Sequence, residues 1–172
     1  FKIITAGRIT ETKNLHILIE AAEILRNKSF DFQIKIAGKP ILESDRTYFE
    51  KLKNIIKEKN FDGIIEFVGP IPNKDIAKFY QSGDLFVNLS DTGSLDRAVL
   101  EAMACDLEIL TSNEAFKNIV SEENFTTKNA EDIVEKIIYL MKDVGSPGLR
   151  EYVVKNHNLD NLINKIIKQF EK

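Results

Sequence analysis

The stretch Leu89-Ser-Asp-Thr-Gly-Ser-Leu-Asp-Arg-Ala-Val-Leu-Glu-Ala-Met-Ala-Cys105 decides the fold, because it carries the chain from a strand into a helix. The apolar residues 84–89 predict a strand, and residues 95–105 predict a helix. The small polar residues around Gly93 predict a loop between them. The first amides of a helix favour anions, and a carboxylate such as Glu101 can accept two hydrogen bonds from a diol. This junction therefore predicts a binding site for an anionic ligand that is rich in hydroxyl groups.

Short β-rich segments alternate with amphipathic helical segments along the rest of the chain. We predict strands over residues 1–6, 30–37, 64–68, 84–89 and 107–110. We predict helices over residues 13–27, 45–60, 73–81, 95–105, 129–142, 148–156 and 159–171. This alternation indicates the α/β class, as one domain with a parallel sheet of about six strands, helices on both faces and further helices at the C-terminus.

The composition is that of a folded globular protein. Of the 172 residues, 43% are hydrophobic and 30% are charged, and no apolar run approaches the roughly 20 residues of a spanning helix. The net charge of −3 gives no support to a nucleic-acid partner. The single cysteine, Cys105, excludes an internal disulfide, and we expect it to be packed. Because Phe1 already lies in a predicted strand, we expect the natural protein to extend further in the N-terminal direction.

Glycines and cations follow the predicted strands, at the end where parallel α/β sheets bind ligands. Gly7 and Arg8 follow the first strand, and Lys13 opens the first helix. Arg8 and Lys13 are candidates for a diphosphate clamp, with ordinary surface positions beside a turn as the alternative. Gly38 and Gly69 follow the next two strands, where each serves either as a turn residue or as an opening to a ligand.

Polar residues around the central loop extend the candidate site. Residues 90–94 supply small groups and accessible amides. Asp96 is either the N-cap of the next helix or a ligand contact, and Glu101 is either a ligand contact or a solvated carboxylate. His16 and His157 have no partner at a metal-ligand spacing, so we assign both to structural positions and predict no metal site.

Several short motifs, taken in order, resemble one known family. They are Gly7-Arg8 with Lys13, Ile36-Ala-Gly38, Phe67-Val-Gly-Pro-Ile71, Phe79-Tyr-Gln-Ser-Gly-Asp-Leu-Phe-Val-Asn-Leu-Ser90 and Leu100-Glu-Ala-Met-Ala104. Together they cover almost the whole chain and resemble the C-terminal domain of the group 1 glycosyltransferases. The last motif, at its distance after the fourth strand, is the most specific of them.

The resemblance implies a GT-B architecture, in which two Rossmann-like domains face each other across a cleft. Residues 1–172 would form the C-terminal, donor-binding domain, and the N-terminal acceptor domain would lie outside this chain. The implied activity is that of a hexosyltransferase-like enzyme, which transfers sugar from a nucleotide-diphosphate sugar with retention of anomeric configuration. The nucleotide sugar would be a co-substrate, and neither cofactor nor metal is implied. We expect the isolated chain to be inactive.

The same resemblance assigns roles to individual residues. Arg8 and Lys13 would be the catalytic cations that hold the donor diphosphate, and Glu101 would bind the ribose hydroxyls. Backbone amides of residues 93–95 would meet the phosphates or the sugar, and residues near Gly38 and 67–69 would flank the base. The implied donor-binding set is Gly7, Gly38, Val68, Gly69, Thr92, Gly93, Ser94, Leu95 and Glu101.

The chain also departs from the family pattern. The usual motif has two glutamates separated by seven residues; Glu101 matches the second, and the first falls on Gly93. Asp91 and Asp96 are candidates for the lost donor-sugar contact, although neither has the right spacing. Asp106 stands where a glycine normally ends the helix, and because aspartate tolerates a left-handed backbone we expect the turn to be kept.

Alternative functions remain open at this point. The absent first glutamate motivates a non-catalytic nucleotide-sugar-binding module, and a related epimerase of the same fold is a further alternative. A dinucleotide dehydrogenase is disfavoured because no Gly-x-Gly-x-x-Gly follows the first strand. By resemblance, the acceptor would be a lipid-linked or growing glycan. The protein would then act in glycan biosynthesis in the cytoplasm, peripheral at the inner face of the membrane.

Overall fold

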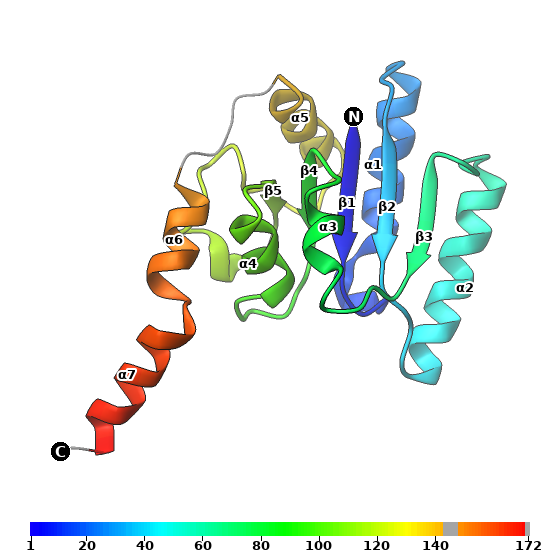
Figure 1. The fold of residues 1–172 in the computed structure, drawn as a ribbon. Helices are drawn as coiled ribbons and strands as arrows, with labels where there is room; N and C mark the ends of the chain where they lie inside the picture. Colours follow the sequence, from blue (N-terminus) through cyan, green and yellow to red (C-terminus); the bar gives the residue numbers. More distant parts are fainter. Residues whose placement is uncertain (143–147, 171–172) are drawn as a thin grey trace.

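Five parallel strands form the centre of the structure, a computed structural model that describes residues 1–142 and 148–170. The strands are β1 (Lys2–Ala6), β2 (Gln33–Ala37), β3 (Ile65–Gly69), β4 (Leu85–Asn88) and β5 (Glu108–Thr111). Their order is β3-β2-β1-β4-β5, and each neighbouring pair is parallel (Figure 1). The predicted α/β class and parallel sheet are confirmed.

The expected strand number is wrong by one, because the sheet has five strands and not six. After β5 the chain makes an isolated parallel bridge between Thr111 and Phe125, and the next helix begins at Ala130. A single bridge does not extend into a ladder, so the described residues form no sixth strand.

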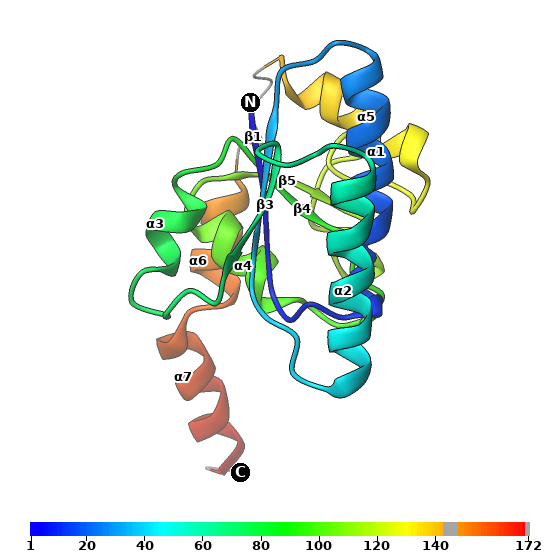
Figure 2. The ribbon, with the colours of Figure 1, turned by 90° about the vertical axis from the view of Figure 1, so that its right-hand side faces the viewer.

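Helices cover both faces of the sheet, as predicted. They are α1 (Leu15–Asn27), α2 (Glu43–Glu58), α3 (Ile76–Tyr80), α4 (Arg97–Ala104), α5 (Ala130–Leu140), α6 (Leu149–Asn156) and α7 (Leu159–Phe170), with 3-10 turns η1 (Glu11–Lys13) and η2 (Glu114–Phe116). Helices α1, α2 and α5 lie on one face, and α3, α4 and α6 lie on the other (Figure 2). Ile3 joins the core beneath α1, whereas its neighbour Ile4 joins the core beneath α4. Successive strand side chains point to opposite faces, which explains how one strand serves both cores.

The strand order places a topological switch point between β1 and β4. The chain proceeds from β1 outward to β2 and β3, and then returns to the other side of β1 with β4. In open parallel sheets the crevice beyond such a point is the usual ligand site. The loops that follow β1 and β4 therefore meet at the carboxyl edge of the sheet.

The turn after α4 keeps its expected geometry. Cys105 caps the helix, and Asp106 adopts a φ of 64°, in the left-handed region that glycine favours. The prediction that aspartate would preserve this turn is confirmed.

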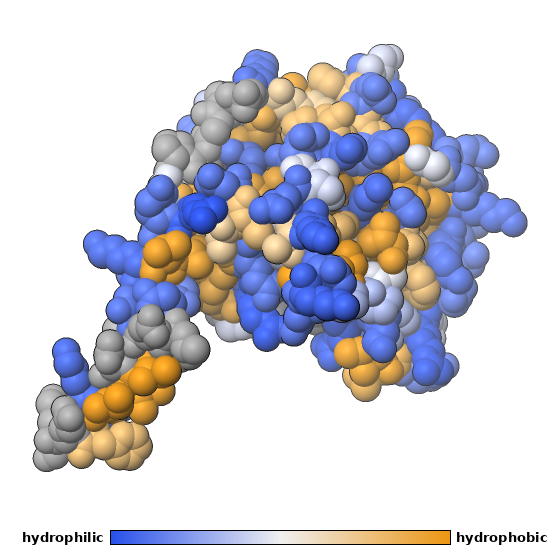
Figure 3. All heavy atoms as spheres, viewed as in Figure 1, coloured by the Kyte–Doolittle hydropathy of each residue, from blue (hydrophilic) through white to orange (hydrophobic). Residues whose placement is uncertain are grey.

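Helix α7 extends away from the rest of the fold (Figure 1). It exposes apolar side chains, which Figure 3 shows gathered along the helix. Ile163, Ile166 and Ile167 are 43–47% exposed, and Phe170 is 85% exposed. Within the described residues, no helix combines the length and the apolar character needed to cross a bilayer.

Candidate functional site

An open pocket of about 390 Å³ lies where the loops after β1 and β4 meet. Its walls come from the β1 loop, η1, helix α3 and the first turns of α4. The predicted site residues that line it are Gly7, Arg8, Lys13, Thr92, Asp96 and Glu101. The structure thus brings together residues that are up to 94 positions apart in the chain.

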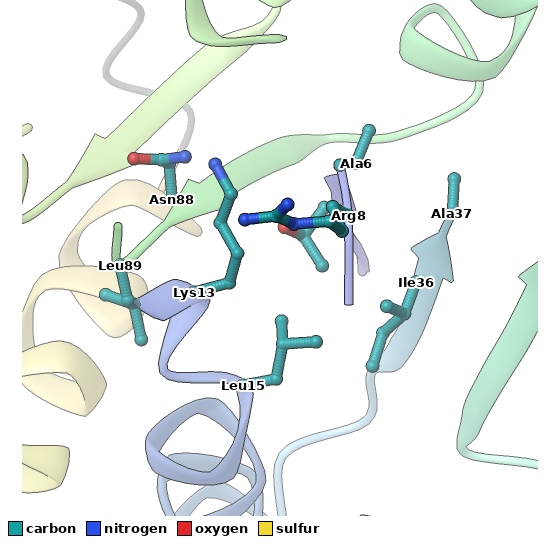
Figure 4. Close-up of a pocket in the computed structure, with 10 residues that line it drawn as sticks. Ala6, Arg8, Lys13, Leu15, Ile36, Ala37, Asn88 and Leu89 are labelled. Atoms are coloured by element: carbon teal, nitrogen blue, oxygen red, sulfur yellow. The ribbon is translucent and has the colours of Figure 1, made fainter. Parts of the chain in front are cut away.

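Lys13 and Asp96 form an ion pair inside this pocket. The Lys13 ammonium donates a hydrogen bond to Oδ2 of Asp96, which also accepts one from the Asn88 amide at 3.1 Å. Figure 4 shows the Lys13 side chain extending toward Asn88. The other Asp96 oxygen accepts from the N–H of Ala98 at 3.2 Å, so Asp96 is the N-cap of α4. One carboxylate therefore both caps the helix and holds the lysine.

Arg8 presents a loosely tethered guanidinium. Its side chain is 47% exposed, and its Nε lies 3.9 Å from Oδ2 of Asp45. That carboxylate accepts hydrogen bonds from the N–H groups of Leu42 and Ile41 at 3.0 and 3.2 Å, at the start of α2. The bond from Leu42 is the main cause that holds the pKa of Asp45 below its ordinary value. Asp45 thus remains a carboxylate that orients Arg8, while the planar end of the guanidinium is open to an anion.

Gly7 and Gly38 allow the loops after β1 and β2 to cross in contact. A Cβ on Gly38 would lie 1.8 Å from the Gly7 carbonyl oxygen, and the φ of Gly38 is +139°. The Gly7 N–H donates to the Ala37 carbonyl at 3.0 Å, and the Gly38 N–H donates to the Gly69 carbonyl at 2.8 Å. Because both N–H groups bond within the backbone, these glycines shape the pocket floor by close packing and not by donating to a ligand.

A second, more apolar pocket of about 230 Å³ adjoins the first. The two pockets share Arg8, Ile71 and Ile76, and Pro70 adds to the wall of the second. In the part of the chain that the structure describes, Val68 does not line either pocket and packs instead against the core on the α4 face. The wall after β3 therefore begins just beyond the predicted residues Val68 and Gly69.

The loop of residues 90–95 reaches the first pocket through Thr92. Among the residues that the structure describes, Gly93, Ser94 and Leu95 lie outside the lining of that pocket. The Ser94 carbonyl accepts a hydrogen bond from the Asn113 side chain at 2.9 Å, which ties this part of the loop to the segment after β5. The predicted contacts of residues 93–95 with a donor stay predictions.

Asp91 faces away from this site. Its carboxylate accepts a hydrogen bond from the Asn14 amide at 2.8 Å and pairs with Lys128. The bond from Lys128, followed by that from Asn14, lowers the pKa of Asp91. Asp91 lines a separate depression with His16 and Tyr48. Of the two candidate acids, only Asp96 lies in the pocket with Arg8 and Lys13.

Glu101 is held between two side chains at the edge of the pocket. The Tyr80 hydroxyl donates to its Oε2 at 3.0 Å, and the Arg97 Nε lies 3.3 Å from its Oε1. The carboxylate side chain remains 38% exposed. Burial, and secondarily the charge of Glu101, raise the pKa of the Tyr80 hydroxyl. Tyr80 therefore stays protonated and acts as the donor.

The two histidines and the cysteine lie outside the site. Among residues 1–142 and 148–170, no group of three or more His, Cys, Asp and Glu side chains is arranged to hold a metal ion. His16 Nδ1 lies 3.0 Å from the Tyr48 hydroxyl, and the His157 ring packs beside Tyr152 at 5.6 Å. Cys105 is half-buried, and burial raises the pKa of its thiol.

Sequence reasoning missed Tyr80, Asn88 and Asp45 as parts of this site. Tyr80 and Asn88 fall within a motif that was used only for the family resemblance. A signal existed for Tyr80, because a tyrosine on the buried face of a helix needs a partner for its hydroxyl. No local pattern connects Asp45 with Arg8.

Sequence comparison matches the family model described as "Glycosyl transferases group 1" to residues 1–160. The amylovoran biosynthesis glycosyltransferase AmsK of Erwinia amylovora is 28% identical in an alignment 120 positions long, which covers 66% of this chain and 28% of AmsK. A glycosyltransferase of Haemophilus influenzae is 27% identical in an alignment 175 positions long, which covers 98% of this chain and 47% of that protein. The chain thus spans less than half the length of these relatives.

Solved structures share the fold. HepE of Anabaena, in a complex with UDP and glucose, has a TM-score of 0.86 and 17% identity, with 100% of this chain and 48% of HepE covered. The C-terminal domain of LpcC, a glycosyl transferase group 1 family protein of Francisella tularensis, has a TM-score of 0.80 and 23% identity, with 92% and 87% covered. At these identities the likeness establishes a Rossmann-like fold and nothing further.

Proposed function

The chain belongs to the group 1 glycosyltransferases, and from this premise we propose that it forms the donor-binding domain of a retaining enzyme that uses a nucleoside-diphosphate sugar. The observation that carries the proposal is the pocket shared by Arg8, Lys13 and Glu101. Two cations suit a diphosphate, and a carboxylate can accept hydrogen bonds from the hydroxyls of an adjoining ribose. The UDP and glucose bound to HepE, which has the same fold, support this interpretation.

In this proposal the diphosphate binds Arg8 and Lys13. The Arg8 guanidinium, which is 47% exposed and lies 3.9 Å from Asp45 through its Nε, offers a fork to two phosphate oxygens. Lys13 is paired with Asp96, and a diphosphate, which carries more negative charge than one carboxylate, would share or take over its ammonium. Glu101 would accept hydrogen bonds from the ribose hydroxyls. The base would enter the apolar pocket beside Ile71 and Ile76.

Catalysis would then be mainly electrostatic. As the bond between the sugar and the phosphate oxygen breaks, negative charge grows on the leaving diphosphate. Arg8 and Lys13 stabilise that charge in a partly enclosed site, where ionic interactions are stronger than in bulk water. The departing phosphate can assist in removing the acceptor proton, so this domain need not supply a nucleophile.

The acceptor would bind a second, N-terminal domain of the same protein. The lengths of the relatives support this proposal, since the chain accounts for 47% of the Haemophilus glycosyltransferase. The relative AmsK is named as a glycosyltransferase of amylovoran biosynthesis, which supports a lipid-linked or growing glycan as the acceptor. We place such an enzyme in the cytoplasm, peripheral to the inner face of the membrane.

One observation favours a second candidate, a non-catalytic nucleotide-sugar-binding module. The position of the usual first glutamate is Gly93, which carries no side chain, and Asp91 faces Lys128 instead of the pocket. Such a module would bind donor without transferring its sugar.

A ligand screen of the full-length protein tests the proposal. Thermal shift and calorimetry with UDP-, GDP-, ADP- and TDP-sugars should identify a donor that stabilises the protein. Arg8→Ala and Glu101→Gln should lose most of that stabilisation. Arg46→Ala is the matched control, because Arg46 pairs only with Glu43 on the surface of α2 among described contacts. Binding of none of these donors would reject the proposed function, and binding without transfer to any glycan acceptor would select the binding module.

A further inference from the structure

We propose that Tyr80 is a positioning residue, which fixes the Glu101 carboxylate so that it selects a nucleotide with an intact ribose diol. This inference rests on the proposed function, because it concerns how one of the proposed donor contacts is set. The observation behind it is a single hydrogen bond between two helices: Tyr80 ends α3, and its hydroxyl donates to Oε2 of Glu101 on α4 at 3.0 Å.

The Tyr80 ring is held rigidly. Tyr80 is 1% exposed, and its ring packs edge-on against Phe86 of β4 at 5.7 Å and beside Phe79 at 6.2 Å. The ring therefore has little freedom to follow the carboxylate. The Tyr80 hydroxyl is therefore a hydrogen-bond donor in a fixed position, and it stabilises a Glu101 oxygen there.

The second partner of Glu101 is much less constrained. Arg97 lies one helical turn earlier on α4, and its side chain is 83% exposed. Exposed pairs of this kind contribute little and exchange readily with water. A glutamate on a helix surface also has several accessible rotamers, and its carboxylate accepts two hydrogen bonds from a diol when its oxygens point at that diol. Of the described contacts, the bond from Tyr80 is thus the one that sets the orientation of Glu101.

The experiment measures the ratio of the affinities for a nucleotide and for its 2′-deoxy form. The full-length protein is titrated calorimetrically with the best binder among UDP, GDP and ADP, and with the 2′-deoxy form of the same nucleotide. We expect the wild type to favour the ribose form by about 10-fold or more, the effect of one charge-assisted hydrogen bond. Tyr80→Phe should reduce this preference to below about 3-fold, as should Glu101→Gln. The double variant should lose no more than either single variant, because the two residues act as one unit.

Tyr48→Phe is the matched control, since it removes a hydroxyl that contacts His16 outside the donor pocket. It should leave the preference intact. If Tyr80→Phe weakens both nucleotides equally, the residue is merely structural and the inference is overturned. The inference is also overturned if Tyr80→Phe keeps the wild-type preference for the ribose nucleotide while Glu101→Gln loses that preference.

The proposed function fails differently. If the wild type binds none of the three nucleotides, or binds the ribose and 2′-deoxy forms equally, the proposed role of Glu101 is refuted. The inference about Tyr80 is then refuted as well. If Tyr80→Phe does not fold, 4-fluorophenylalanine at position 80 fills the space of the hydroxyl without donating, and 4-aminophenylalanine restores a donor. The preference must be lost with the first and retained with the second.

Discussion

Replacing Gly38 by alanine tests the backbone crossing between the loops after β1 and β2, where Gly7 lines both pockets and Gly38 lines the second. The new Cβ would lie 1.8 Å from the Gly7 carbonyl oxygen and 2.9 Å from its carbonyl carbon. The loops would have to separate by about 1 Å, which is overpacking at a cost of roughly 1–3 kcal/mol. The movement would also weaken the bonds from Gly7 to Ala37 and from Gly38 to Gly69, at roughly 0.5–1.5 kcal/mol each. The positive φ adds roughly 1–2 kcal/mol, so we expect a loss of about 3–8 kcal/mol in unfolding free energy.

Gly63→Ala is the matched control for this substitution. Gly63 also has a positive φ, of +82°, but a Cβ there would meet no atom within 4 Å. It should cost only the backbone term of about 1–2 kcal/mol. Equilibrium urea unfolding, followed by far-UV circular dichroism, measures both variants under the same conditions. If Gly38→Ala is destabilised no more than Gly63→Ala, the two loops do not cross as described.

Three further predictions concern charged groups. Arg8→Ala should weaken donor binding by about 1.5–3 kcal/mol in the full-length protein, and unchanged affinity by calorimetry would reject its phosphate contact. Lys13→Met and Asp96→Asn should show a coupling of about 0.5–3 kcal/mol in a double-mutant cycle of unfolding free energies, whereas additive effects would mean that the pair is absent in solution. Burial alone would raise the pKa of Asp132, but hydrogen bonds from the Thr127 N–H and from the hydroxyls of Thr127 and Thr126 hold it below its ordinary value of 3.8. A lowered carboxyl pKa stabilises the fold above the unfolded-state pKa, and this contribution is lost as the pH falls through the folded-state pKa. Asp132→Asn should therefore lose less stability than the wild type between pH 6 and pH 3 in urea titrations, and equal losses would contradict the assignment.

Local sequence patterns predicted the architecture because successive side chains of each strand point to opposite faces of the sheet, and each face carries its own core. Ile3 and Ile4 point to opposite faces, and apolar residues on both faces of a strand are typical of a covered parallel sheet. The same reasoning placed Arg8 and Glu101 near one crevice, since each follows a strand at the switch point. The five predicted strand segments correspond to the five strands of the sheet, and only the total of about six was one too high.

The finer arrangement of the site depends on contacts between distant residues, which local patterns do not encode. Asp91 is drawn away from the pocket by Lys128, which is 37 residues further along the chain. Position 38 has no room for a side chain because the Gly7 carbonyl oxygen lies against it. The residues around Gly38 alone do not indicate that the loop after β1 passes so close. The bond from Tyr80 to Glu101 likewise joins two helices whose packing is set by the core between them.

A crystal structure of the full-length protein with its nucleoside diphosphate tests the central claim most directly. We predict diphosphate oxygens within about 3 Å of the Arg8 guanidinium and the Lys13 ammonium, together with ribose hydroxyls hydrogen-bonded to Glu101. A nucleotide bound elsewhere, with Lys13 still paired only with Asp96 and Glu101 facing solvent, would contradict the account.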